Sequence, residues 1–198
     1  MAITNGYCTL AELKAALRIS DSTDDVLLEN TIEAASRRID GYCGRYFYQQ
    51  NAVLKVFARN ELVVFLRDDL VSVTTLAADT SGDQTFVTTF TANTDFALEP
   101  YNAALLGIPY NRITAVGGKT FPIFTIPPIP GVKITGVFGY PSVPDDVREA
   151  CVLLAARGFA RYNSALGVVG FADMAVQVRA VDPDVRDYLN RYVKMGIG

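Results

Sequence analysis

The sequence predicts an α+β protein: a bundle of about four helices, two N-terminal and two C-terminal, with an antiparallel β region inserted between them. Three observations predict this fold class. Apolar residues recur at helical spacing near both ends of the chain. The middle contains short runs rich in β-branched and aromatic residues, separated by turn signals. Half of the 198 residues are apolar, which is enough for a core and for apolar surface buried against partner subunits.

We expect a single domain over residues 1–198, because the chain has no internal repeat and no low-complexity linker. Its helical part is predicted at 1–47 and 142–198, and its β-rich insertion at 48–141.

Two helices are expected before the β insertion. Thr9 and Glu12 form a capping box that begins a short helix over 9–17. Ser22 or Thr23 can cap a second, longer helix. The apolar stripe of this second helix has spacings of four, three, four and three residues: Leu28, Ile32, Ala35, Ile39 and Tyr42.

The middle of the chain is predicted to form strands, with turns at ARN and RDD. Residues 101–130 contain many prolines and are expected to be an extended loop with one strand. The predicted strands are 53–58, 61–66, 70–76, the stretches FVTTFTA and DFALEP, the neighbourhood of NRITAV, and 131–140.

Two more helices are expected after the β insertion. Pro144 suits the first turn of a helix that continues to about residue 163. Asp182 and Pro183 open a terminal helix. One side of that terminal helix carries Val185, Tyr188, Leu189 and Tyr192.

Composition excludes several classes of function. The chain has no histidine, which removes the usual general base, metal ligand and triad member. Its net charge of −3 does not favour tight nucleic-acid binding. Neither a signal peptide nor a continuous membrane-spanning run is visible. We therefore expect no metal, no cofactor and no membrane partner.

The three cysteines, Cys8, Cys43 and Cys151, are widely separated and form no CxxC pair, so neither a disulfide framework nor a zinc site is expected. A reducing compartment is the better expectation. Cys43, two residues before Arg45, is a candidate nucleophile. The absence of histidine and its place at a helix C-terminus favour a structural role. Cys151 fits a small core residue.

Two further motifs are candidate chemical sites. The GGKT stretch at 117–120 lacks the first glycine of a phosphate loop, because Ile113 stands at that position. A carboxylate-based hydrolase would need two acidic groups to converge in a cleft. The positions Asp68–Asp69 and Asp79–Asp83 favour solvated turns instead. The full set of candidates is Asp68, Asp69, Asp79, Asp83, Asp95, Glu99 and Asp173.

Arg37, Arg38 and Arg45 form a small basic cluster near the end of the second helix. A favourable interaction with the helix dipole explains it, and a partner-binding role is the alternative. With no catalytic constellation, the chain is predicted to work by shape.

The stretch GYCGRYF is predicted to end the second helix and turn the chain toward the β region. Gly44 is expected to adopt a left-handed conformation there. Tyr42 continues the apolar stripe, Arg45 lies at the negative end of the helix, and Phe47 anchors the chain. We call these four residues the helix-end hinge.

The order of elements and the residues resemble the head–tail connector proteins of long-tailed bacteriophages, also called head-to-tail adaptors or head completion proteins. The N-terminal part of the resemblance is carried by Thr9, Leu10, Leu13, Lys14, Leu17, Ile19, Asp24, Asp25, Leu27, Leu28, Ile32, Ala34, Ala35, Ile39, Tyr42, Gly44, Arg45 and Phe47. The later part is a strand from Val132 to Tyr140, followed by Pro144, Asp145, Val147 and Ala150. Together they cover about 70 residues.

The resemblance implies a structural virion protein at the head–tail junction, which is present in the host cytoplasm during assembly. It implies a homo-oligomeric ring of twelve copies beneath the portal protein. That ring would extend the DNA channel, let DNA pass without specific binding, and present a surface to the stopper or tail-completion protein. Adaptors of this kind perform no chemistry. The alternatives are another virion module, such as a tail terminator or minor capsid protein, and the carboxylate hydrolase.

The resemblance also implies that the C-terminal segment, Asp182 to Gly198, docks onto the portal. The expected contacts are Val185, Tyr188, Leu189 and Tyr192. The alternative is that these side chains pack on the protein's own helices.

Overall fold

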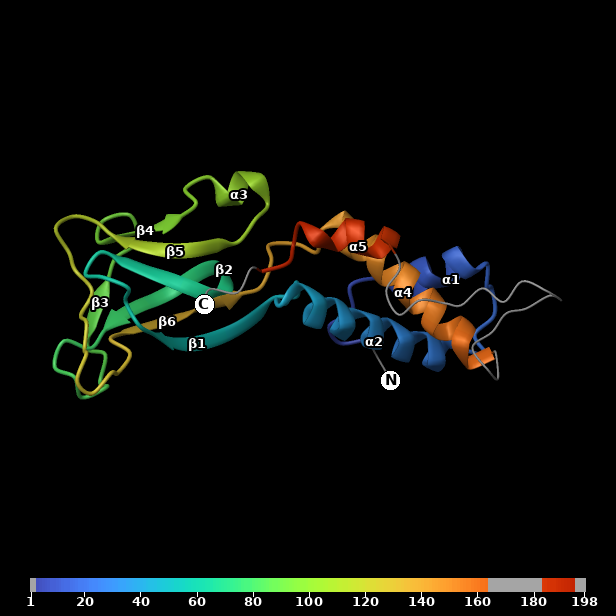
Figure 1. Ribbon diagram of the computed structural model, residues 1–198, viewed down its shortest axis with the longest axis horizontal. Helices are drawn as coiled ribbons and strands as arrows, with labels where there is room; N and C mark the ends of the chain where they lie inside the picture. Colours follow the sequence, from blue (N-terminus) through green and yellow to red (C-terminus); the bar gives the residue numbers. More distant parts are fainter. Residues whose placement is uncertain (1–2, 164–182, 195–198) are drawn as a thin grey trace. The chain divides into compact units, whose positions relative to one another are not determined.

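A computed structural model describes residues 3–163 and 183–194. Helices and antiparallel strands both occur, which confirms the α+β class (Figure 1). The chain divides into two compact units: a helical unit, Met1–Tyr48 with Val143–Gly198, and a β unit, Gln49–Ser142. The predicted boundaries of the helical part and the β insertion lie one residue from these. That both units act as a single adaptor domain stays a prediction.

The described residues of the helical unit contain four helices. The two long helices, α2 and α4, pack against each other, and the short helices α1 and α5 each contact both of them (Figure 1). The bounds are Leu10–Leu17 for α1, Asp25–Cys43 for α2, Asp145–Asn163 for α4 and Pro183–Asn190 for α5.

The first helix begins as predicted. The Thr9 hydroxyl accepts a hydrogen bond from the backbone N–H of Glu12 at 3.2 Å, and the Glu12 carboxylate accepts one from the N–H of Thr9 at 2.7 Å. This capping box satisfies two of the N–H groups that a helix start leaves without partners.

The predicted cap of the second helix is wrong. Asp24 is the N-cap of α2, not Ser22 or Thr23, and its side chain makes no capping bond. The backbone N–H of Thr23 is instead bound by the Asp21 carboxylate, which holds the preceding residues in a turn of their own.

The core of the helical unit confirms four members of the predicted stripe of α2, whereas the fifth, Tyr42, is only half-buried. Leu28, Ile32, Ala35 and Ile39 are buried, as is Cys151 on α4. Burying a side chain such as leucine or isoleucine contributes about 1.5–3 kcal/mol, so the packing of α2 against α4 stabilises the unit.

The β unit is one antiparallel sheet in the order β1-β6-β2-β5-β4, with β3 paired to β2. The short helix α3 connects β4 to β5, at the end of this order that lies away from β1. The bounds are Gln50–Val56 for β1, Val63–Ala78 for β2, Thr88–Phe90 for β3, Phe96–Glu99 for β4, Ala103–Leu106 for α3, Tyr110–Ala115 for β5 and Val132–Phe138 for β6.

The long strand β2 corrects the predicted strands 61–66 and 70–76. The RDD stretch lies inside β2 rather than in a turn, because the register of β2 against β5 shifts between Phe65 and Leu70. Such a bulge absorbs residues that break the alternation without ending the strand.

The segment 101–130 also differs from the expected loop. It contains α3, which was not predicted, together with β5, which confirms the predicted strand near NRITAV. Four-residue helices carry too short an apolar pattern to be recognised from sequence. Of the stretch FVTTFTA, only Thr88–Phe90 forms a strand.

A single apolar cluster lies within the β unit. Its buried members are Val64, Leu66, Leu70, Leu76, Phe96, Ile113, Ala115, Phe121, Val132, Ile134 and Phe138. Strands β2, β5 and β6 contribute alternate buried residues, and alternate residues of β1, which are only partly buried, pack against the cluster. This is the pattern expected of a sheet with one face on the core.

Candidate functional site

The end of α2 is the feature that the sequence singled out. Gly44 caps the helix with φ of 64°, and its N–H donates to the Asp40 carbonyl at 2.8 Å. This left-handed conformation is the predicted one, and it favours glycine because a Cβ would crowd the backbone. The role of Tyr42, Gly44, Arg45 and Phe47 as a hinge stays a prediction.

Phe47 lies between two aromatic rings that the sequence did not connect with it. The rings of Tyr7 and Tyr192 each stand 5.5 Å from the Phe47 ring centroid, both at interplanar angles of 86°. Edge-to-face pairs of this kind contribute about 0.5–1.5 kcal/mol beyond their buried area. With only 1% of its surface exposed, Phe47 anchors the chain within the helical unit.

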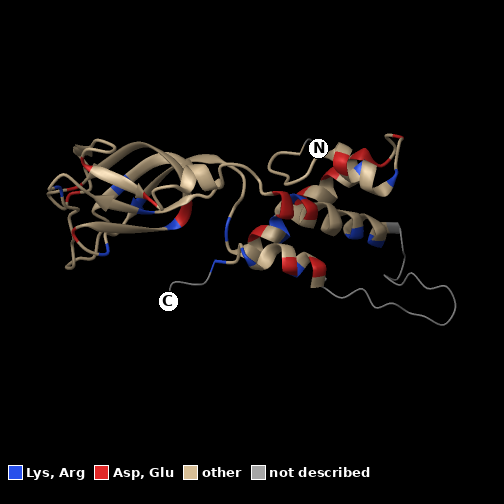
Figure 2. Cartoon of the chain, turned by 90° about the horizontal axis from the view of Figure 1, so that it is seen from above, with Lys and Arg blue, Asp and Glu red and all other residues tan. Residues whose placement is uncertain are grey.

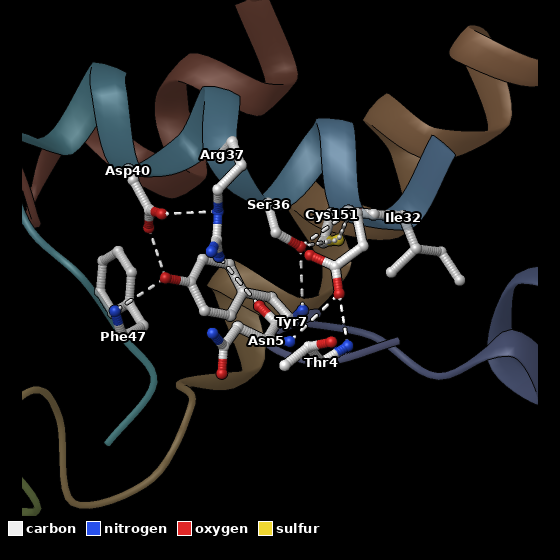
Figure 3. A network of polar contacts seen from close by, with 10 residues as sticks. Thr4, Asn5, Tyr7, Ile32, Ser36, Arg37, Asp40, Phe47 and Cys151 are labelled. Carbon is white, nitrogen blue, oxygen red and sulfur yellow. Dashed lines mark hydrogen bonds and ion pairs between the residues drawn. The ribbon is translucent and has the colours of Figure 1, made fainter. Parts of the chain in front are cut away.

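A buried polar network surrounds this aromatic contact (Figure 3). The Tyr7 hydroxyl donates to the Asp40 carboxylate and accepts the backbone N–H of Phe47 at 2.9 Å. The other Asp40 oxygen pairs with Arg37 Nε at 3.0 Å. Arg37 also donates to the Asn5 carbonyl at 2.9 Å and lies over the Tyr7 ring. The network therefore joins the N-terminal segment, α2 and the segment that follows it.

The electrostatics of this network favour a structural role. Burial raises the pKa of Asp40, while the Tyr7 hydrogen bond and the Arg37 charge offset part of that rise. Burial, followed by the hydrogen bond to Asp40, raises the pKa of Tyr7 far above its ordinary value. Tyr7 therefore keeps its proton and acts as a hydrogen-bond donor rather than an acid or base. The engagement of Arg37 within the unit explains one member of the predicted basic cluster.

The last described helix packs against the same region. Val185, Leu189 and Tyr192 are 1%, 2% and 8% exposed, while Tyr188 is 37% exposed. Three of the four expected portal contacts are therefore buried in the helical unit. Only Tyr188 is available to a partner without rearrangement. Asp182 and the residues after 194 lie outside the described part of the chain.

Backbone and side-chain bonds fix this C-terminal segment. The Tyr42 hydroxyl donates to Asn190 at 2.7 Å, and the N–H of Lys194 donates to the Cys43 carbonyl at 2.9 Å. The second bond satisfies a carbonyl at the end of α2 that would otherwise lack a partner.

Cys43 is not a nucleophile. It is fully buried, and burial raises the pKa of Cys43 to about 11, although Arg45 works against the rise. A thiol with that pKa is almost entirely protonated at neutral pH.

The glycines of the GGKT stretch also have a structural explanation. Gly117 and Gly118 have φ of 61° and 74° in the turn after β5. A Cβ on Gly117 would lie 2.4 Å from the carbonyl oxygen of Thr94. The turn requires glycine for close backbone approach, and the next described residues form no helix that could hold a phosphate.

The candidate carboxylates serve local structure. Asp68 and Asp69 lie in β2, so their assignment to a turn is wrong. Asp79 does lie in a turn, where it is buried and accepts backbone N–H groups of Gly82 at 2.7 Å and Gln84 at 2.8 Å. Although burial would raise the pKa of Asp79, these bonds hold it below its ordinary value.

The remaining candidate carboxylates also bind nearby backbone or side-chain groups. Asp83 binds its neighbour Thr85, and Asp95 binds the backbone of Thr91. Glu99 pairs with Arg112 and accepts the Thr114 hydroxyl. Asp173 lies outside the described residues. Within the described ranges, no group of three His, Cys, Asp or Glu side chains could hold a metal ion.

One acidic cavity was missed by sequence reasoning. A hollow of about 410 Å³ in the helical unit is lined by Glu12, Asp145 and Glu149 together with Arg148. Arg148 forms ion pairs with Glu12 and Asp145 across it. The hydrogen bond from the Thr9 backbone, with a smaller contribution from the Arg148 charge, lowers the pKa of Glu12, so this carboxyl is poorly suited to general acid catalysis.

The β unit carries exposed apolar side chains that no motif indicated. Tyr101, Leu105 and Leu106, at and beside α3, are 69%, 87% and 65% exposed; we call them the α3 apolar cluster. At the other end of the strand order, Val53 on β1 and Phe57 just after β1 are 58% and 57% exposed. Clustered exposed apolar residues mark interaction surfaces. Figure 2 shows the charged residues more densely on the helices than on the strands.

None of the described helices is long and apolar enough to cross a bilayer.

Comparison with known proteins finds a family that part of the chain resembles. Residues 7–66 match the family model described as phage gp6-like head-tail connector protein. None of the curated proteins matches the chain. The predicted resemblance to head–tail connector proteins is confirmed.

Three solved structures contain a chain of similar fold. They are the neck of an empty gene transfer agent (GTA) particle computed with C6 symmetry, the neck of a native GTA particle computed with C12 symmetry, and the virion of the native particle, with TM-scores of 0.59, 0.56 and 0.57. In each, 21% of aligned residues are identical, and the alignment covers 100% of this chain and 94% of the other. The fold of both units is therefore shared with these chains.

Proposed function

We propose that this chain, which resembles head–tail connector proteins over residues 7–66, forms a homo-oligomeric adaptor ring between the portal and the stopper or tail-completion protein. The ring has twelve copies and extends the DNA channel, and DNA passes through it without specific binding. It assembles in the host cytoplasm and remains at the head–tail junction of the virion.

The observation that carries this proposal is the extent of the shared fold. The family match ends at residue 66, early in β2, but the structural alignment includes the whole chain and nearly all of a chain from a particle neck. The β unit is therefore part of a neck-protein fold rather than an unrelated insertion. The neck of that native particle was computed with C12 symmetry, which supports a ring.

Exposed apolar surface supports ring formation. A closed ring needs two different, complementary patches on every copy, because each subunit contacts its two neighbours head to tail. The β unit carries two different apolar patches at opposite ends of its strand order: the α3 apolar cluster, and Val53 on β1 together with Phe57 just after it. We propose that the first patch of one copy meets the second patch of the next.

The helical unit supports the portal-facing role. We propose that α1, α2, α4 and α5 act as one four-helix bundle and that Tyr188 is its contact with the portal. Val185, Leu189 and Tyr192 act indirectly, because their burial holds α5 in place.

The test mixes the purified chain with its cognate portal and examines the product by native mass measurement and negative-stain imaging. We expect a stoichiometric ring on the portal. A chain that stays unassociated at every concentration overturns the proposal. Binding to tail tube or capsid instead of portal assigns the chain to another virion module.

Two pairs of variants locate the contacts. Tyr188→Ala is expected to weaken portal binding, while Tyr162→Ala, at an exposed tyrosine near the end of α4, leaves it unchanged. Leu105→Asp is expected to leave rings incomplete. Ile126→Asp changes a loop residue that is 95% exposed and serves as its control. If Tyr188→Ala and Tyr162→Ala bind the portal equally well, the proposed portal contact is refuted. If Leu105→Asp and Ile126→Asp form rings equally well, the proposed contact between copies is refuted.

A further inference from the structure

Two buried cysteines from distant parts of the sequence touch in the helical unit. Cys8, in the segment before α1, lies with its Sγ 3.4 Å from the Sγ of Cys151 on α4. They are 4% and 0% exposed, and all three cysteines of the chain are free thiols. Since a disulfide is about 2.05 Å long, closing this gap takes a movement of little more than 1 Å, shared between two side chains.

The surroundings position both sulfurs. The Sγ of Cys151 lies 3.4 Å from the Ser36 hydroxyl and 3.9 Å from the Ile32 carbonyl, contacts that fix its side chain against α2 (Figure 3). Cys8 lines a cavity of about 530 Å³ whose other walls include Thr4 and Arg148. A small solute can therefore approach the pair from the side of Cys8, while Cys151 lies behind it.

The two thiols differ in acidity. Cys8 donates its S–H to Cys151, and this bond together with burial raises the pKa of Cys8. The same bond from Cys8, with support from Ser36, lowers the pKa of Cys151 despite its burial. Cys151 is thus the sulfur of the pair that more readily gives up its proton, and the thiolate is the form that reacts with oxidants.

We propose that Cys8 and Cys151 form a latent disulfide, a site of oxidative modification that links the N-terminal segment covalently to α4. With hydrogen peroxide as the oxidant, one thiolate attacks the O–O bond and becomes a sulfenic acid, releasing hydroxide that takes up a proton to give water. The sulfur of the second cysteine then attacks the sulfenic sulfur and expels its hydroxyl, which leaves as a second water. Two thiols and one peroxide yield one disulfide and two waters.

The expected consequence is a more stable helical unit. The bond would join residues 143 positions apart, and a link that closes so long a loop removes much of the conformational freedom of the unfolded chain. A connector that assembles in a reducing cytoplasm and leaves the cell in a virion would meet oxidant only after assembly. That timing rests on the proposed function; the bond itself does not.

The experiment uses the isolated full-length chain, without portal, so its result is independent of ring formation. Reduced protein is treated with hydrogen peroxide and digested under non-reducing conditions for mass mapping of the peptides. We expect a linked Cys8–Cys151 peptide lighter by two hydrogen atoms, and a rise in Tm on the order of 5–10 °C that a reductant reverses. Cys43→Ser should keep the link, whereas Cys8→Ser and Cys151→Ser should lose it.

A second measurement guards against variants that fail to fold. Wild-type protein is oxidised in its native state and, separately, after unfolding in urea. The native sample should give the Cys8–Cys151 pair alone, while the unfolded sample should also give pairs with Cys43. Free thiols in the native sample, or a native link through Cys43, would overturn the proposal.

Discussion

Replacing either of two glycines at the end of α2 by alanine should change the free energy of unfolding, in opposite directions at the two positions. Gly41 lies inside the helix, and Gly44 caps it, three residues later. Gly41→Ala should stabilise the protein and Gly44→Ala should destabilise it. The pair tests the interpretation of this segment as a glycine-terminated helix end.

The structure gives a different cause for the effect at each glycine. A Cβ added to Gly41 meets nothing within 4 Å, so alanine acts through helix propensity and gains about 0.5–1 kcal/mol. A Cβ added to Gly44 comes no closer than 3.9 Å to the Cβ of Lys194. Steric room exists there too, and the cost is that of the left-handed backbone at φ of 64°, about 1–2 kcal/mol.

The free energy of unfolding is measured by urea titration, followed by the helical circular dichroism signal because the chain has no tryptophan. We expect the two variants to differ by about 1.5–3 kcal/mol, on either side of wild type. If Gly44→Ala proves neutral or stabilising, α2 does not end in a left-handed glycine. If Gly41→Ala destabilises, the helix does not continue through that residue.

The remaining predictions concern the polar network. Tyr7→Phe removes the hydroxyl that donates to Asp40 and accepts the N–H of Phe47, so it should lower the free energy of unfolding by about 2–4 kcal/mol. The exposed Tyr46→Phe should change it by less than about 0.5 kcal/mol, and equal effects would contradict a role for the Tyr7 hydroxyl. Because the pKa of Asp40 is raised in the folded state, its contribution to stability is present below the ordinary value of 3.8 and declines as pH rises through the folded pKa. Unfolding titrations of wild type and Asp40→Asn across this range should show that decline in wild type only; parallel curves would refute it.

Some features were predictable because their causes lie within a few residues. The capping box of Thr9 and Glu12, the stripe from Leu28 to Ile39 and the end of α2 at Gly44 each depend on local backbone geometry or helical spacing. The absence of histidine similarly directed the prediction toward a protein that works by shape.

Errors arose where packing overrode the local signal. Arg67, Asp68 and Asp69 are turn formers by composition, yet they continue β2 because neighbouring strands pair with it on both sides of a bulge. The apolar face of α5 fits equally a partner surface or an internal contact. Spacing alone cannot distinguish the two, because both bury the same stripe.

The sequence by itself determined the capping box that begins α1, the glycine that ends α2 and the family pattern, since each is encoded by neighbouring residues. Only the tertiary structure decided which distant side chains meet. It placed Phe47 between Tyr7 and Tyr192, and Cys8 against Cys151, across sequence separations that no local pattern reports. Such contacts depend on how whole helices pack, because the energy that selects them is the burial of the shared core.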